Sequence, residues 1–149
     1  MCLETTKEVT EKFRKKNKNK KFIWAYKVYQ VRNNRLYSVI YGINLISPGE
    51  IRSNRSRLSF DKRDQDNWYV DEDCNEDRII LWEISRGIHV FEKIVNTRNF
   101  SDFCSNRVIV RVKCLMKDFV AYDVVSKEAV FKKVYLDEKE YNKALREKY

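Results

Sequence analysis

The strict alternation of side-chain types between residues 107 and 114 constrains the fold of this chain more than any other pattern. Valines take every second position, and basic residues with one isoleucine lie between them: Val108, Val110, Val112 and Arg107, Ile109, Arg111, Lys113. Successive side chains of a β-strand point to opposite faces of its sheet, so a period of two predicts a strand. We therefore expect a half-buried strand here, with a basic outer face.

Residues 22–31 also predict a strand, because aromatic and β-branched side chains dominate them. Both faces of this strand are partly apolar: Trp24, Tyr26, Val28 and Gln30 on one, Ile23, Lys27 and Tyr29 on the other. Asn33-Asn34 then predicts a turn into a strand at 36–41, which makes a β-hairpin.

Turn residues and short apolar runs outline the rest of the sheet. Pro48-Gly49 has the residue types that a type II turn favours. Further strands are expected at 88–91, 119–125 and 129–135.

Helices are expected at both ends of the chain. Thr5 and Glu8 have the spacing of a capping box, and Val9 and Phe13 form an apolar i, i+4 pair in the helix that would follow. At the other end, a helix is expected from residue 138 to 148, with acidic residues in its first turn and basic residues near its end.

Two shorter helical segments are expected in the middle of the chain. Arg86-Gly87 resembles a helix stop, so a short helix is favoured over a strand at 77–85. Asn96 or Thr97 could cap a helical turn that reaches Phe103.

These elements together predict an α+β fold, with an antiparallel β-sheet and a helix at each end. A length of 149 residues fits a single domain. The expected organisation is a basic N-terminal helix or arm at residues 1–21 and one α+β domain at 22–149.

Several classes of protein are not expected. The longest uncharged stretch, residues 36–49, is shorter than the ~20 apolar residues of a membrane span, and the N-terminus has no secretory pattern, so a cytoplasmic protein without membrane contact is expected. Four cysteines with one histidine give no zinc-finger spacing, and three glycines exclude a glycine-rich phosphate loop. We expect free, buried thiols, no metal and no cofactor.

A group of longer motifs resembles a known but uncharacterised domain. They are WAYKVYQV, SPGEI, FDKRD, ISRGIHVF, VIVRVKCLMKDFVAYD and EAVFKKVYL. The domain occurs in phages, other large-genome viruses and bacteria, sometimes beside pentapeptide repeats, which this chain lacks. The similarity covers roughly residues 22–136 and is specific only around Gly87–Phe91. It implies a viral or mobile-element origin and brings no agreed catalytic mechanism.

The leading functional hypothesis is a non-enzymatic protein that binds a phosphorylated ligand. Guanidinium groups bind phosphate oxygens in pairs, and hydroxyl groups add neutral donors. The candidate ligand-binding residues are Arg52, Arg55, Arg57 and Ser53, with His89 and an aromatic wall of Trp24 and Tyr26. The ligand would be a nucleotide or a nucleotide-derived signal, and its binding could counteract a host defence. Pairing of the arginines with nearby aspartates, and a core position for His89, are the structural alternatives.

Three other functions stay open. The basic arm, with Lys15, Lys16, Lys18, Lys20 and Lys21 beside aromatic residues, could bind nucleic acid without sequence preference, in keeping with a net charge of +9. A basic face could instead inhibit a host protein. An ADP-ribosyltransferase-like enzyme would use Tyr29 to Arg32 and Glu128. The oligomeric state is left open, a homo-oligomer included.

Overall fold

The computed structural model describes residues 3–38, 45–52, 68–70, 80–84, 87–97 and 106–147. In chain order its elements are β1 (Leu3–Thr6), α1 (Lys7–Lys16), β2 (Phe22–Arg32), β3 (Arg35–Ser38), β4 (Leu45–Ile46), β5 (Gly49–Arg52), β6 (Trp68–Val70), β7 (Ile80–Ile84), β8 (Ile88–Phe91), the 3-10 helix η1 (Ile94–Thr97), β9 (Arg107–Leu115), the 3-10 helix η2 (Met116–Asp118), β10 (Phe119–Asp123), β11 (Glu128–Phe131), β12 (Lys133–Leu136) and α4 (Glu138–Arg146).

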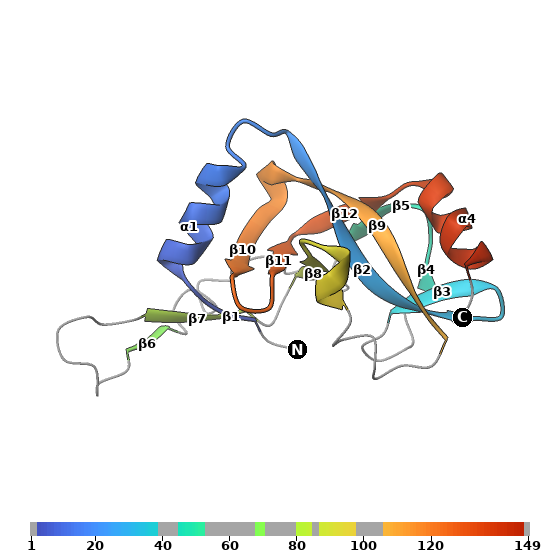
Figure 1. Cartoon of the computed structure of the whole chain (residues 1–149), viewed down its shortest axis with the longest axis horizontal. Coiled ribbons are helices and arrows are strands. Elements are labelled where there is room, and N and C mark those ends of the chain that lie inside the picture. The colour runs from blue at the N-terminus through green and yellow to red at the C-terminus, as the bar shows by residue number, and fades with distance from the viewer. Residues whose placement is uncertain are drawn as a thin grey trace.

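An antiparallel sheet of nine strands forms most of the described molecule (Figure 1). Its main path runs β10-β11-β8-β2-β9-β12-β5, and β3 joins β2 and β4. Helices α1 and α4 lie at opposite ends of this sheet in Figure 1. The predicted fold class, a single α+β domain with a helix at each end of an antiparallel sheet, is confirmed.

The pair β2–β9 forms the centre of the sheet, with a continuous register from Phe22↔Leu115 to Gln30↔Arg107. One face of the pair is the core: Ala25, Tyr29, Val31, Val108, Val110 and Val112 are buried there. The strands expected from alternation at 107–114 and from composition at 22–31 are therefore both confirmed.

Helix α1 packs on the edge strand β10 through Phe13. The ring of Phe13 stacks on Tyr122 at 4.1 Å between centroids and contacts Phe119 at 5.1 Å. Thr10 is fully buried, and its Oγ1 accepts a hydrogen bond from the Tyr122 amide at 3.3 Å. These contacts fix the helix that carries the N-terminal basic residues onto the sheet.

Turns follow the expected residue types. Asn33 and Asn34 both have positive φ, at 49° and 61°, as a two-residue hairpin turn between β2 and β3 requires. Gly49, the first residue of β5, has a φ of 110°, which glycine adopts without strain. Gly87 has a φ of 108°, and a Cβ there would lie 2.5 Å from Cγ1 of Val130, so this glycine is needed for packing.

Three expectations about secondary structure were wrong. Residues 80–84 form strand β7, which pairs with β1 and β6, because pairing outweighed the helix-stop pattern at 86–87. Thr5 lies in β1 and its Oγ1 donates to the Tyr122 carbonyl, so it caps no helix and α1 begins at Lys7. The strand expected at 129–135 is two strands, β11 and β12, separated at Lys132.

Other expected features lie partly or wholly outside the described residues. The helical turn expected from Asn96 or Thr97 to Phe103 falls almost entirely outside the described residues, and the 3-10 helix η1, which ends at Thr97, precedes it. Residues 39–41 of the second hairpin strand also lie outside the described residues. Cys114 is a buried free thiol, as expected, whereas the other three cysteines lie outside the described part. Among the helices described, none is both long and apolar enough to cross a membrane.

Candidate nucleic-acid interface

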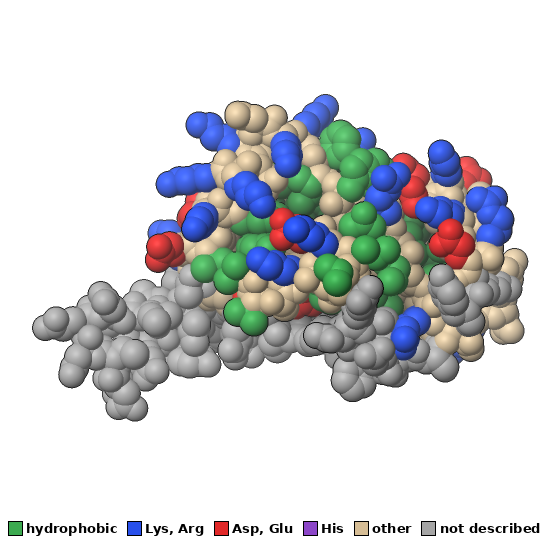
Figure 2. Space-filling model, in the orientation of Figure 1, with side chains coloured by type: hydrophobic (Ala, Val, Ile, Leu, Met, Phe, Trp, Pro, Cys, Tyr) green, Lys and Arg blue, Asp and Glu red, His purple; other side chains and the backbone are tan. Residues whose placement is uncertain are grey.

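The outer face of β2 and β9, opposite the core, carries a row of aromatic side chains next to a row of basic ones. Phe22, Trp24 and Tyr26 alternate with core residues along β2, and each is half-buried. The register places Trp24 opposite Lys113 and Tyr26 opposite Arg111. Over these strands, Figure 2 shows exposed hydrophobic side chains in a band beside Lys and Arg side chains.

Contacts between the two rows are direct. Lys113 Nζ lies 4.2 Å from the ring centroid of Phe22, and Arg111 Cζ lies 4.3 Å from that of Trp24. The rings of Phe22 and Trp24 meet edge to face at 5.8 Å. We call these four residues, together with Tyr26, the cation–aromatic ladder: Phe22, Trp24, Tyr26, Arg111 and Lys113. A cation over the face of an aromatic ring is attracted by the ring, so these contacts stabilise the arrangement of the side chains.

The two cations of the ladder differ in their other partners. Arg111 donates to Oε1 of Glu140 on α4 at 2.9 Å, which holds its guanidinium between that carboxylate and Trp24. Lys113 takes part in none of the ion pairs formed within the described residues. The ammonium of Lys113 is therefore the ladder cation that a ligand could bind at the least cost.

The basic residues after α1 continue from the ladder. The carbonyl of Lys21 accepts a hydrogen bond from the Met116 amide at 3.0 Å, so the segment before β2 is fixed beside the end of β9. Four lysines between the last turn of α1 and the start of β2 are exposed and form no ion pair within the described part of the chain: Lys15, Lys18, Lys20 and Lys21. Lys16 differs, since its Nζ lies 3.5 Å from Oε1 of Glu92.

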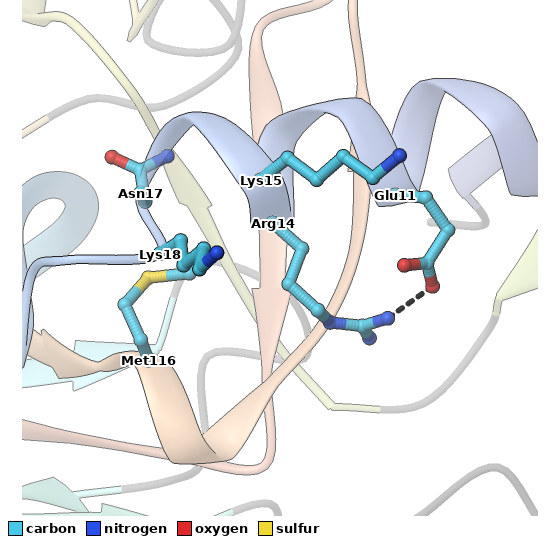
Figure 3. A pocket seen from close by; sticks show the side chains of 6 residues that line it. All are labelled: Glu11, Arg14, Lys15, Asn17, Lys18 and Met116. Carbon is cyan, nitrogen blue, oxygen red and sulfur yellow. Dashed lines mark hydrogen bonds and ion pairs between the residues drawn. The ribbon is translucent and has the colours of Figure 1, made fainter.

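A cavity of about 300 Å³ lies where α1 ends and η2 begins (Figure 3). It is lined by Glu11, Arg14, Lys15, Asn17, Lys18 and Met116. Nδ2 of Asn17 donates to the Phe13 carbonyl at 2.9 Å, which closes the last turn of the helix. The cavity therefore has a fixed backbone wall, and its charged lining residues are three basic side chains and one glutamate.

Of the three arginines in the phosphate-binding hypothesis, the structure describes only Arg52. Arg52 ends β5, and its Nε and Nη2 donate to the two carboxylate oxygens of Glu50 at 2.8 and 3.2 Å. Lys133 lies 3.0 Å from the same carboxylate. The hydrogen bonds from Arg52 and Lys133 lower the pKa of Glu50 to about 2. Ser53, Arg55 and Arg57 lie outside the described residues.

His89 lies on β8, with both imidazole nitrogens buried and without a hydrogen-bond partner among the described residues. Burial, with the positive charge of Lys27, lowers the pKa of His89 to about 4. Lys27 Nζ donates to the His89 carbonyl at 3.0 Å, just where β8 and β2 cease to pair after Tyr26↔Phe91. This geometry fits a role in the structure and offers no open ring nitrogen to a ligand.

The residues of the enzyme hypothesis do not form one site. Strand alternation puts Tyr29 and Arg32 on opposite faces of β2, and the hydroxyl of Tyr29 is buried in the core. Glu128 is buried on β11, accepts a hydrogen bond from Ser126 Oγ at 3.1 Å, and has a pKa raised by burial.

Comparison of the chain with family models, with curated proteins and with solved structures gives no match. The residues themselves therefore carry the functional argument.

Sequence reasoning identified Trp24 and Tyr26 but missed their partners. Arg111 and Lys113 were expected on a basic outer face, and nothing in the sequence paired that face with the aromatics of β2. The sequence did contain a usable pattern: two strands with a period of two, one with a basic face and the other with an aromatic face. The pairing itself joins segments that are far apart in the chain.

Proposed function

We propose that this protein binds single-stranded nucleic acid, without reading its sequence, on the outer face of β2 and β9. The observation that carries the proposal is the cation–aromatic ladder. Proteins that bind single strands combine a basic surface for phosphates with aromatic side chains on which bases stack. Both kinds of group lie here on one face of two central strands, next to the exposed lysines that follow α1.

The spacing of the aromatic side chains in the ladder favours a nucleic-acid single strand with unstacked bases over a duplex. Side chains on one face of a strand are about 6.6–6.8 Å apart, because each residue adds about 3.3–3.4 Å. This is about twice the ~3.4 Å between successive nucleotides of one strand in a duplex. Phe22, Trp24 and Tyr26 therefore suit bases that have been separated from one another, which only a single strand allows at low cost.

The described residues support this function over the binding of a small phosphorylated ligand. Arg52 is already paired with Glu50, whereas Lys113 and the lysines after α1 have no carboxylate partner in the described part. If the chain is viral, as its motifs suggest, it would bind such strands in the host cytoplasm. Binding there could keep host defence sensors from viral transcripts or replication intermediates.

Fluorescence anisotropy with a labelled homopolymeric single strand tests the proposal. Base stacking on one ring contributes roughly 1–3 kcal/mol, so Trp24→Ala should weaken binding about fivefold or more. The conservative change Trp24→Phe keeps a ring and should stay within about threefold of the parent. A Trp24→Ala variant that is folded by circular dichroism and binds like the parent would refute the proposal.

Salt and strandedness provide the second measurement. If the exposed lysines contact phosphates, affinity falls steeply between 50 and 200 mM salt, with a slope of about −0.7 per phosphate contacted. A duplex of the same sequence should bind more weakly than the single strand. Equal binding of the duplex, or binding that is insensitive to salt, would count against this surface as the site.

A further inference from the structure

Arg111 is the planar cation of the cation–aromatic ladder, and two contacts fix its position. It lies opposite Tyr26 in the register, but its Cζ lies 4.3 Å from the ring centroid of Trp24, the diagonal neighbour on β2. Its Nη2 also donates to Oε1 of Glu140 at 2.9 Å. The guanidinium therefore lies over the indole ring, with one edge bound to a carboxylate.

Helix α4 fixes Glu140 in place. The helix lies beside β9, as Figure 1 shows. Its Ala144 is buried, and Tyr141 and Leu145 pack against the core, so the helix cannot move away without exposing apolar side chains. The side chain of Glu140 is only 12% exposed, whereas that of Arg111 is 44% exposed. The guanidinium is thus anchored on one edge and keeps an open side toward the solvent.

The open side of Arg111 suits a base better than a phosphate. Glu140 already compensates the charge of Arg111, whereas Lys113 pairs with no carboxylate among the residues described. A phosphate therefore gains more from Lys113. Nucleic-acid bases stack on guanidinium planes as well as on aromatic rings, and this contact needs an exposed plane in a fixed orientation.

We propose that Arg111 is a base-stacking residue of the single-strand site and that Glu140 is its positioning residue. The inference rests on the proposed single-strand binding and adds a guanidinium plane to the rings on which bases stack. A base on the open side of Arg111 completes a stack of base, guanidinium and indole over Trp24. Helix α4, which contributes no residue to the ladder, then controls the site through one carboxylate.

Two oligonucleotides of equal length, one with bases and one abasic, test the role of Arg111 because they carry the same phosphates. Arg111→Lys keeps the charge and removes the plane, so by anisotropy the strand with bases should bind about fivefold more weakly. The abasic strand should bind Arg111→Lys as it binds the parent. The matched control is Arg146→Lys, the same change at an exposed position of α4, which should alter neither affinity. Equal losses for the two strands would overturn the stacking role, since Arg111 would then contact phosphates.

The variant Glu140→Ala tests the positioning role, because simple electrostatics predicts the opposite sign. Removing a carboxylate near a polyanion site should strengthen binding. If Glu140 positions the guanidinium, the strand with bases should instead bind about threefold more weakly, while the abasic strand binds equally well or better. Glu138→Ala removes the same charge at an exposed position of the same helical turn and should affect both strands alike. An equal change for both strands in Glu140→Ala, in either direction, would overturn the positioning role.

The outcomes separate this inference from the proposed function. If the parent prefers the strand with bases in a way that depends on Trp24 but not on Arg111, single-strand binding stands and the inference fails. If the parent binds neither strand, or binds both equally, the proposed function itself fails.

Discussion

Two basic regions share the outer face of the sheet, and they differ in what their cations contact. The register connects them in one row: Trp24 on β2, Lys113 on β9, Tyr135 on β12 and Glu50 on β5. At the β2–β9 end, cations lie over aromatic rings. At the β5–β12 end, Arg52 and Lys133 converge on the carboxylate of Glu50.

The comparison shows why the number of basic residues is a poor guide to an anion site. Both regions carry two cations, but Glu50 pairs with both Arg52 and Lys133, whereas at the ladder Glu140 pairs with Arg111 and leaves Lys113 without a carboxylate partner among the described residues. A ring attracts a cation more weakly than a carboxylate does, and it also offers a surface for a base. We therefore expect the ladder to bind a polyanion and the Glu50 cluster not to bind one.

Charge reversal at the ladder should change the affinity for single-stranded nucleic acid more than any change at the Glu50 cluster. Lys113→Glu puts a carboxylate next to Trp24 and Arg111, where it repels phosphates and competes for the guanidinium. Single-strand affinity at 50 mM salt should fall about tenfold or more. Lys132→Glu, at an exposed position between β11 and β12, makes the same change in net charge and should lower affinity far less. Equal losses in the two variants would show that only overall charge matters.

Removing the carboxylate from the other region should have the opposite and smaller effect. Glu50→Gln frees Arg52 and Lys133, which lie on β5 and β12, the strands that continue the sheet from the ladder. We expect affinity to rise about threefold, with a salt slope steeper by about one phosphate contact or less. The charge-matched control is Glu138→Gln, at an exposed position in the first turn of α4. An unchanged affinity would mean that a bound strand does not extend across β12.

The strands of both regions could be predicted from the sequence, because a period of two is a local property. Which face of β2 packs into the core could not be predicted. Residues 22–31 have large apolar side chains on both faces, so alternation alone allowed Trp24 and Tyr26 to be core residues. The structure instead buries Ala25, Tyr29 and Val31. Only the pairing of β2 with β9, whose valines form one face, decides which face of β2 is buried. That pairing joins positions distant in sequence.

Local patterns failed where tertiary contacts decided the outcome. A helix-stop pattern at Arg86-Gly87 suggested a helix before it, but residues 80–84 pair as β7, and Gly87 is needed because Val130 leaves no room for a side chain. Arg52 looked like a phosphate ligand in the sequence, and Glu50, two residues earlier, lies on the same face of β5. The sequence could have indicated that pair, since i and i+2 residues of a strand share a face.

The smallest expected effect concerns the titration of Glu50, and it tests the cause of the difference between the two regions. Hydrogen bonds from Arg52 and Lys133 hold its pKa at about 2, below the ordinary 4.5 of a glutamate. Because the folded-state pKa is depressed, the stabilisation from this cluster is complete above about pH 4.5 and is lost as pH falls through about 2. NMR titration of the Glu50 side-chain carboxyl should show this low midpoint, and Arg52→Gln should raise it toward 4.5. A midpoint already near 4.5 in the parent would mean that the cations are only loosely held. Arg52 and Lys133 would then be as available to a phosphate as Lys113, and the contrast between the two regions would disappear.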